Sequence, residues 1–99
     1  MDVKLVDQGE EGILILSGRL ETKNAEEAGE LFLQLADRFK NITFNMKDLK
    51  YISSAGLRIV KKVYMKVRKN GGVLSATDVN EYVMEVFEMT GFSSIINFK

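Results

Sequence analysis

Residues 45–64 read NMKDLKYISSAGLRIVKKVY, and the pattern of side chains changes halfway along this stretch. The first part is strand-like and ends at Ser53 and Ser54, whereas the second part is basic and helix-like. Its apolar residues recur at the spacing of one helical face: Leu57, Val60, Val63, Tyr64 and Val67. A serine at this junction can accept a hydrogen bond from a free N–H of the first helical turn, which typically stabilises a helix by about 1 kcal/mol. The stretch therefore predicts a strand followed directly by a helix over residues 54–69.

The remainder of the chain alternates between strand-like and helix-like segments. Strands are predicted at residues 3–8, 12–20, 41–46, 72–76 and 94–98, and helices at residues 21–39, 54–69 and 78–89. Because parallel strands need a helical crossover between them, this alternation indicates an α/β domain. Only the polar turn GEEG separates the first two strands, so they can form an antiparallel hairpin instead. We expect a single domain over residues 1–99, with a mixed sheet of four to five strands packed with three main helices.

Two features indicate which side chains form the core. Apolar residues run nearly unbroken over residues 13–16, which is typical of a strand covered on both faces. In the first predicted helix, apolar side chains recur at helical spacing with glutamates between them, so this helix is amphipathic. The predicted core includes Leu16, Leu31, Phe44, Leu57, Val60, Leu74, Phe87 and Ile95.

The helix ends carry their own signals. The sequence KNGG stops the second helix, and Asn70 or Gly71 is expected to take the left-handed conformation that ends many helices. Thr77 or Asp78 is expected to cap the start of the third helix. No internal repeat or linker interrupts this order of elements.

Length and composition indicate the class of protein. The chain has 99 residues, of which 45% are hydrophobic and 28% charged, values that are ordinary for one globular domain. No apolar run approaches the roughly 20 residues that span a bilayer, and the opening MDVKLVDQGE lacks a signal-peptide pattern. We therefore expect a cytoplasmic protein with no membrane partner.

The chain contains neither cysteine nor histidine. The first absence removes thiol nucleophiles and thiolate metal sites, and the second removes the commonest general base and transition-metal ligand. A Ser-His-Asp triad therefore cannot be built around Ser53 or Ser54. A lysine-assisted serine would have to use Lys50, and nothing else in the spacing supports that arrangement. We expect no enzymatic activity, no catalytic residue, no metal site and no cofactor.

Charge is balanced over the whole chain but segregated along it. The 14 basic and 14 acidic residues cancel. The second predicted helix lacks acidic residues and contains the basic residues Arg58, Lys61, Lys62, Lys66, Arg68 and Lys69. The third lacks basic residues and contains Asp78, Glu81, Glu85 and Glu88. Each of these surfaces is either simply solvated or steers a charged partner. Overall neutrality, and aromatic residues that mostly belong to apolar stripes, argue against direct binding of nucleic acid.

Phosphorylation is the third interpretation of the two serines, after helix capping and nucleophilic catalysis. A phosphoserine carries a charge of about −1.5 to −2 and three acceptor oxygens. At a helix amino terminus, free N–H groups and the positive end of the helix dipole receive this anion. A phosphate there is expected to leave the domain folded and to change what can dock on its surface.

Three segments resemble blocks of a known family. DLKYISSAGLRIV resembles the signature of anti-sigma-factor antagonists, the small bacterial STAS-domain proteins, in which a strand leads through an Asp-Leu step to an Asp-Ser-Ser-Gly or similar tetrapeptide that opens a helix. SGRLETKNAEE is similar to the family's Gly-Glu-Leu-Asp segment, and VFEMTGFSSIINF is similar to its carboxy-terminal block. The resemblance covers essentially the whole chain.

The resemblance implies roles for individual residues. Ser54 matches the serine that the partner anti-sigma factor, a serine kinase, phosphorylates in the family. Gly56 matches the glycine that lets the helix start close to the neighbouring backbone. Glu21 matches an acidic residue of the early loop near the phosphorylation site, and Asp48 matches the aspartate of the Asp-Leu step.

Two positions depart from the family pattern. Ser53 occupies the usual acidic position before the phosphoserine, and Ala55 replaces the second serine or threonine. The first departure leaves Ser53 as an alternative phosphoacceptor. The expected partner-binding surface contains Glu21, Asp48, Ser53, Ser54, Gly56 and Arg58.

The function that the resemblance implies is a partner switch. The unphosphorylated domain would bind an anti-sigma factor, a serine kinase, and so release a sigma factor for transcription. Phosphorylation of Ser54 would block that binding, and a serine phosphatase would restore it. An alternative with the same fold is a STAS-domain scaffold or accessory subunit of a signalling complex or transporter, without a phosphorylation switch.

Overall fold

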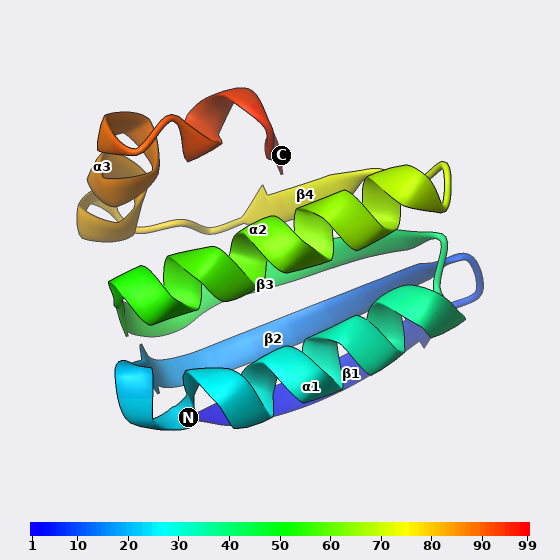
Figure 1. Cartoon of the computed structure of the whole chain (residues 1–99), viewed down its shortest axis with the longest axis horizontal. Helices are drawn as coiled ribbons and strands as arrows, with labels where there is room; N and C mark the ends of the chain where they lie inside the picture. Colours follow the sequence, from blue (N-terminus) through cyan, green and yellow to red (C-terminus); the bar gives the residue numbers. More distant parts are fainter.

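A five-stranded sheet and three helices make up the computed structural model, which describes all residues from Met1 to Lys99 (Figure 1). The strands are β1 (Asp2–Gln8), β2 (Glu11–Leu20), β3 (Asn41–Ile52), β4 (Leu74–Thr77) and β5 (Asn97–Phe98). The helices are α1 (Thr22–Arg38), α2 (Ser54–Lys69) and α3 (Glu81–Met89), with a short 3₁₀ helix, η1 (Phe92–Ser94). The predicted α/β fold is confirmed, and α2 has the predicted bounds.

The strands lie in the sheet in the order of the chain, and the sheet is mixed. The two-residue turn between β1 and β2 makes them an antiparallel hairpin, whereas β2, β3, β4 and β5 are parallel neighbours connected through helices. The register places Leu14 beside Phe44, and Phe44 beside Ala76. These side chains lie on one face of the sheet and are buried.

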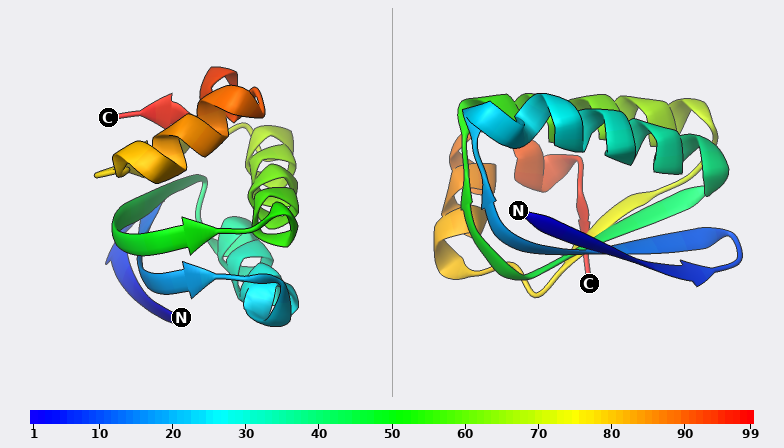
Figure 2. Two further views of the ribbon diagram at one scale, coloured as in Figure 1. Left: turned by 90° about the vertical axis from the view of Figure 1, so that its left-hand side faces the viewer. Right: turned by 90° about the horizontal axis from the view of Figure 1, so that it is seen from below.

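Helices α1 and α2 lie side by side over that same face (Figure 2). The ring of Phe32 from α1 packs 5.1 Å from the ring of Phe44, centroid to centroid. Most of the predicted core side chains are buried, namely Leu16, Phe44, Val60, Leu74 and Phe87, while Leu57 and Ile95 are half-buried.

The prediction that Leu31 belongs to the core is wrong, because this side chain is 39% exposed. The buried stripe of α1 consists of small residues and Phe32. Leu31 precedes Phe32 in the chain and lies beside this stripe, so its side chain faces outward. The prediction that β2 is covered on both faces is also wrong. Ile13 and Ile15 are half-buried, since no helix covers the face of the sheet opposite α1 and α2.

Helix α3 begins later than predicted, at Glu81, and its cap is Asn80 rather than Thr77 or Asp78. The Oδ1 atom of Asn80 accepts a hydrogen bond from the N–H of Val83 at 2.8 Å, and its side-chain amide donates to the carbonyl of Leu49, also at 2.8 Å. One side chain therefore caps α3 and ties it to β3. At the end of α2, Gly71 takes the left-handed conformation with φ 79°, one of the two predicted positions.

Strand β3 runs six residues beyond its predicted end at residue 46 and finishes at Ile52. The pairing of β2 with β3 shifts register between Ile15 and Ser17 and again between Gly18 and Arg19. Such irregularities bend a strand, and both strands curve toward the helix layer where they end (Figure 2). The bend brings the ends of β2 and β3 to the starts of α1 and α2.

A polar cluster on the uncovered face joins β2 and β3 to Lys99, which follows β5. The Thr43 hydroxyl donates to the Glu11 carboxylate at 2.6 Å, and the Lys99 ammonium lies 2.9 Å from the same carboxylate oxygen. Hydrogen bonds from Thr43 and from Lys99 hold the pKa of Glu11 below its ordinary value. The cluster therefore favours the ionised carboxylate in the folded protein.

We expect Thr43→Val to lower the free energy of unfolding at neutral pH by about 1 kcal/mol, because the hydrogen bond to the carboxylate is lost. The folded-state pKa of Glu11 lies below its ordinary value of 4.5, so this stabilisation is present above 4.5 and is lost as the pH falls through the folded-state pKa. Urea unfolding at several pH values measures the difference. Thr43→Ser keeps the hydroxyl and should keep the acid dependence, whereas an equal loss at every pH for Thr43→Val would contradict the assignment.

Candidate functional site

The starts of α1 and α2 are neighbours because the chain after β3 is bonded to the end of β2. The backbone N–H of Ser53 donates to the carbonyl of Leu20 at 2.9 Å. Leu20 is the last residue of β2, and the next residue, Glu21, is the N-cap of α1. The two helix amino termini, which carry partial positive charge, therefore lie together at one edge of the sheet.

Ser53 is the N-cap of α2, as predicted for a serine at this junction. Its hydroxyl oxygen accepts a hydrogen bond from the N–H of Gly56 at 3.1 Å, and its carbonyl accepts one from the N–H of Leu57 at 2.9 Å. The residue is only 8% exposed. Both its backbone and its hydroxyl are therefore used within the fold.

Ser54 differs from Ser53 in every one of these respects. It is the first residue of α2, it is exposed, and its side chain makes no hydrogen bond within the chain. The first N–H groups of a helix have no partner inside the helix, so an anion on Ser54 would lie next to unpaired donors. Hollows of about 530, 470 and 240 Å³ indent the surface elsewhere, and neither serine lines any of them. Ser54 thus lies on the exposed surface, outside these three hollows.

Gly56 lies where α2 approaches the ends of β2 and β3 most closely. A Cβ atom at this position would come within 2.8 Å of Cγ of Leu20 and 2.9 Å of Cγ1 of Ile52. Both of those side chains are buried. The predicted reason for glycine, close approach to a neighbouring strand, is confirmed by these contacts.

Glu21 is held in place by charged and amide groups around it. Its carboxylate accepts a hydrogen bond from Nε of Arg19 at 2.7 Å, and Lys23 lies 3.8 Å from its other oxygen. Its backbone N–H donates to Oδ1 of Asn24 at 2.9 Å. The hydrogen bond from Arg19 lowers the pKa of Glu21 below its ordinary value, which favours the ionised carboxylate.

Arg19 also leads to a pair of tyrosines that the sequence did not single out. Its guanidinium lies 4.4 Å from the centre of the Tyr51 ring, and that ring stacks on Tyr82 of α3 at 6.1 Å. The register pairs Arg19 with Tyr51, but this register could not be read from the sequence because two irregularities precede it. The cluster connects the start of α1 with α3.

The remaining two expected partner-binding residues are exposed but lie farther along their elements. Arg58 is on the second turn of α2, four residues after Ser54. Asp48 is opposite Ser17 in the pairing of β2 and β3, four residues before the end of β3. At about 3.3 Å per residue, Asp48 is separated from Ile52 by roughly 13 Å of strand. The structure therefore gathers Glu21, Ser53, Ser54 and Gly56, with Arg58 one turn away, and leaves Asp48 apart.

No group of three or more acidic side chains lies together in a way that could hold a metal ion. None of the helices combines the length and the apolar composition that crossing a bilayer requires. What the site offers is an exposed hydroxyl at a helix start, a buried capping hydroxyl beside it, and charged groups around both. This arrangement suits modification and docking.

The chain belongs to the STAS domain family, whose pattern matches residues 3–99. It is 38% identical to BtrV of Bordetella bronchiseptica, a candidate anti-sigma factor antagonist, over 94% of this chain and 83% of that protein. It is 28% identical to the anti-sigma-B factor antagonist of Bacillus subtilis, over 93% of this chain and 85% of that protein.

The fold is also that of SpoIIAA, an anti-sigma factor antagonist. The unphosphorylated form of SpoIIAA superimposes with a TM-score of 0.85 at 16% identity, covering 99% of this chain and 88% of SpoIIAA. The phosphorylated form of Bacillus SpoIIAA superimposes with a TM-score of 0.78, covering 99% of this chain and 91% of SpoIIAA. At this identity the likeness establishes the fold.

We expect Gly56→Ala to lower the free energy of unfolding by up to about 2 kcal/mol. Alanine has the better helix propensity by roughly 1 kcal/mol, but overpacking against Leu20 and Ile52 typically costs about 1–3 kcal/mol. The measurement is urea unfolding of Gly56→Ala alone and in a Leu20→Ala background, where the added methyl group has room and should cost less. A Gly56→Ala protein more stable than wild type, with Leu20 intact, would show that the close approach carries no constraint.

Proposed function

We propose that this chain is an anti-sigma-factor antagonist, switched off by phosphorylation of Ser54. The observation that carries the proposal is the contrast between the two adjacent serines in a STAS-family chain. Ser54 is exposed at the start of α2 with a free hydroxyl, whereas Ser53 is buried with its hydroxyl engaged. A kinase can reach the first without opening the fold, and cannot reach the second.

The similar proteins support this proposal. BtrV and the Bacillus subtilis relative carry names that describe anti-sigma factor antagonism, and SpoIIAA is known in an unphosphorylated and a phosphorylated form. In the proposed cycle, unmodified Ser54 lies within the surface that binds an anti-sigma factor with serine-kinase activity, and a sigma factor is released. A serine phosphatase then returns the phosphorylated chain to the binding form.

The phosphate blocks binding through electrostatics and desolvation. It adds a charge of about −1.5 to −2 to a surface that must lose its water when the partner docks. Burying an ion without a partner charge costs several kcal/mol, and about 1.4 kcal/mol already lowers affinity tenfold. Within the free domain the same phosphate is stabilised by the unpaired N–H groups of α2 and by the positive end of its dipole, so the domain stays folded.

The surface that docks surrounds Ser54. Glu21 and Arg19 border it at the start of α1, and Arg58 extends it along α2. Gly56 is buried below this surface and contributes indirectly, because it lets α2 begin close to the sheet. Asp48 contributes only if the partner also covers the bend of β3.

The test uses a purified anti-sigma factor with serine-kinase activity, to be sought among the products of the neighbouring genes. We expect it to phosphorylate wild type on Ser54 and to bind the phosphorylated form at least about tenfold more weakly. Ser54→Ala should bind without regulation, and Ser54→Asp should bind weakly, although one carboxylate imitates a dianion poorly. Mass spectrometry of the phosphorylated chain and a binding titration give both answers.

Ser53→Ala is the matched control, because it removes the neighbouring hydroxyl and should leave the chain phosphorylatable. Phosphate found only on Ser53, or unchanged affinity after phosphorylation of Ser54, would contradict the switch. A chain that binds no anti-sigma factor and instead co-purifies with a transporter would favour the role of an accessory subunit.

A further inference from the structure

The outward side of α2 carries four cations, one methionine and no acidic group. After Ser54, the exposed residues Arg58, Lys61, Lys62, Met65 and Lys69 follow at helical spacing. Because an α-helix turns about 100° per residue, these five and Ser54 lie within an arc of about 100°. We call the five side chains from Arg58 to Lys69 the basic face. No other element lies over it (Figure 1).

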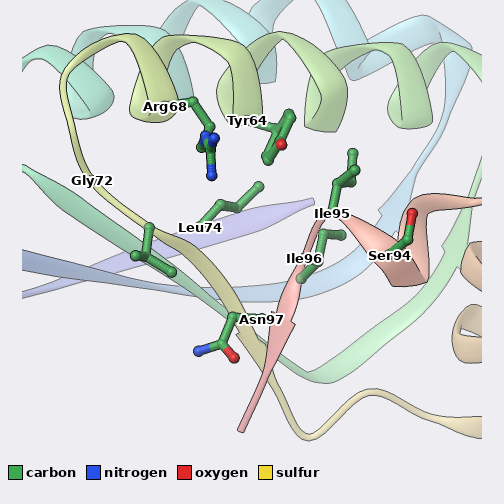
Figure 3. A pocket seen from close by; sticks show the side chains of 9 residues that line it. Tyr64, Arg68, Gly72, Leu74, Ser94, Ile95, Ile96 and Asn97 are labelled. Atoms are coloured by element: carbon green, nitrogen blue, oxygen red, sulfur yellow. The ribbon is translucent and has the colours of Figure 1, made fainter.

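None of the four cations of the basic face forms an ion pair. The other two cations of α2 are used differently. Lys66 lies 2.9 Å from Asp37 of α1, and Arg68 points toward the hollow beside Tyr64 (Figure 3). The positive charge of the basic face is therefore available to another molecule.

Helix stability does not account for this arrangement. Arg58 is three and four residues from Lys61 and Lys62, spacings at which like charges repel each other. Only Lys69, in the last turn, gains from the negative end of the helix dipole. The exposed side of α1 instead mixes both signs, as solvated helices commonly do: Lys23, Glu26, Glu27, Glu30, Asp37 and Arg38. The basic face is thus single-signed within a chain of zero net charge, as is the acidic exposed side of α3 with Glu81, Glu85 and Glu88.

The composition of the basic face fits a protein partner better than a nucleic acid. Met65 lies at its centre and is 59% exposed, and a flexible apolar side chain of this kind is common at protein-binding surfaces. The face has no aromatic side chain on which a base could stack, and the neutral chain exerts little long-range attraction on a polyanion.

We infer that the basic face docks on an acidic surface of the anti-sigma factor, with Met65 as its apolar anchor. This inference rests on the proposed function and extends it. Ser54 lies at the amino-terminal end of the same side of α2, so its phosphate stands where the acidic surface of the partner has to approach. Phosphorylation then repels the partner as well as adding an ion that must be desolvated, and the two effects act in the same direction.

The experiment compares two variants of equal charge in their binding to the purified anti-sigma-factor kinase of the test above. Lys61→Glu with Lys62→Glu reverses two charges of the basic face, and Lys4→Glu with Lys40→Glu reverses two exposed charges outside α2. We expect the first variant to bind at least about tenfold more weakly, mainly through slower association, and the second to bind like wild type. The association rate of wild type should also fall as salt is raised.

Equal affinities of wild type and the Lys61→Glu, Lys62→Glu variant would overturn the inference while leaving the proposed function intact. Failure of wild type itself to bind the kinase would remove the proposed function and the inference together. Two further measurements identify other occupants. Tight binding of a 20-base-pair DNA duplex, or self-association of wild type that the double reversal abolishes, would assign the basic face to nucleic acid or to a second copy of this chain.

Discussion

The hydrogen bond from the N–H of Ser53 to the carbonyl of Leu20 fixes the point at which α2 begins. This bond joins the end of the β3 segment to the end of β2, after both strands have bent toward the helix layer (Figure 2). Gly56 allows the first turn of α2 to rest on Leu20 and Ile52 without a side chain between them. The helix start therefore has one position, and the exposure of the next hydroxyl follows from it.

We propose that structure and regulation are divided between two adjacent residues, Ser53 and Ser54. Ser53 closes the first turn of α2 by accepting the N–H of Gly56, so a phosphate on Ser53 would disturb the fold. The side chain of Ser54 is exposed and makes no hydrogen bond within the chain, so in the proposed switch a phosphate there would change only the surface. From Arg58 onward, cations without ion-pair partners extend this surface along α2. The exposed apolar side chain of Met65 lies among them. Under this proposal the domain would switch partners without changing its fold.

The sequence predicted best what depends on local interactions. The order of the elements and the bounds of α2 were correct because the apolar spacing and the capping serine act within a few residues. Leu31 was misplaced because an amphipathic stripe has edges that only packing against the sheet defines. The start of α3 was missed because Asn80 is fixed by a hydrogen bond to Leu49, which is distant in the chain. The contact of Arg19 with Tyr51 depends on a register with two irregularities, which no local pattern encodes.

The central claim is that phosphate on Ser54 alters the docking surface and leaves the fold unchanged. Amide hydrogen exchange of the unmodified and Ser54-phosphorylated chains, measured beside their affinities for the anti-sigma factor, tests it most directly. The account predicts equal protection of the amides in β2 and β3, slower exchange of the first amides of α2 where they bind the phosphate, and a large loss of affinity. Lower protection across the sheet in the phosphorylated chain would contradict the account, because affinity would then be lost through unfolding.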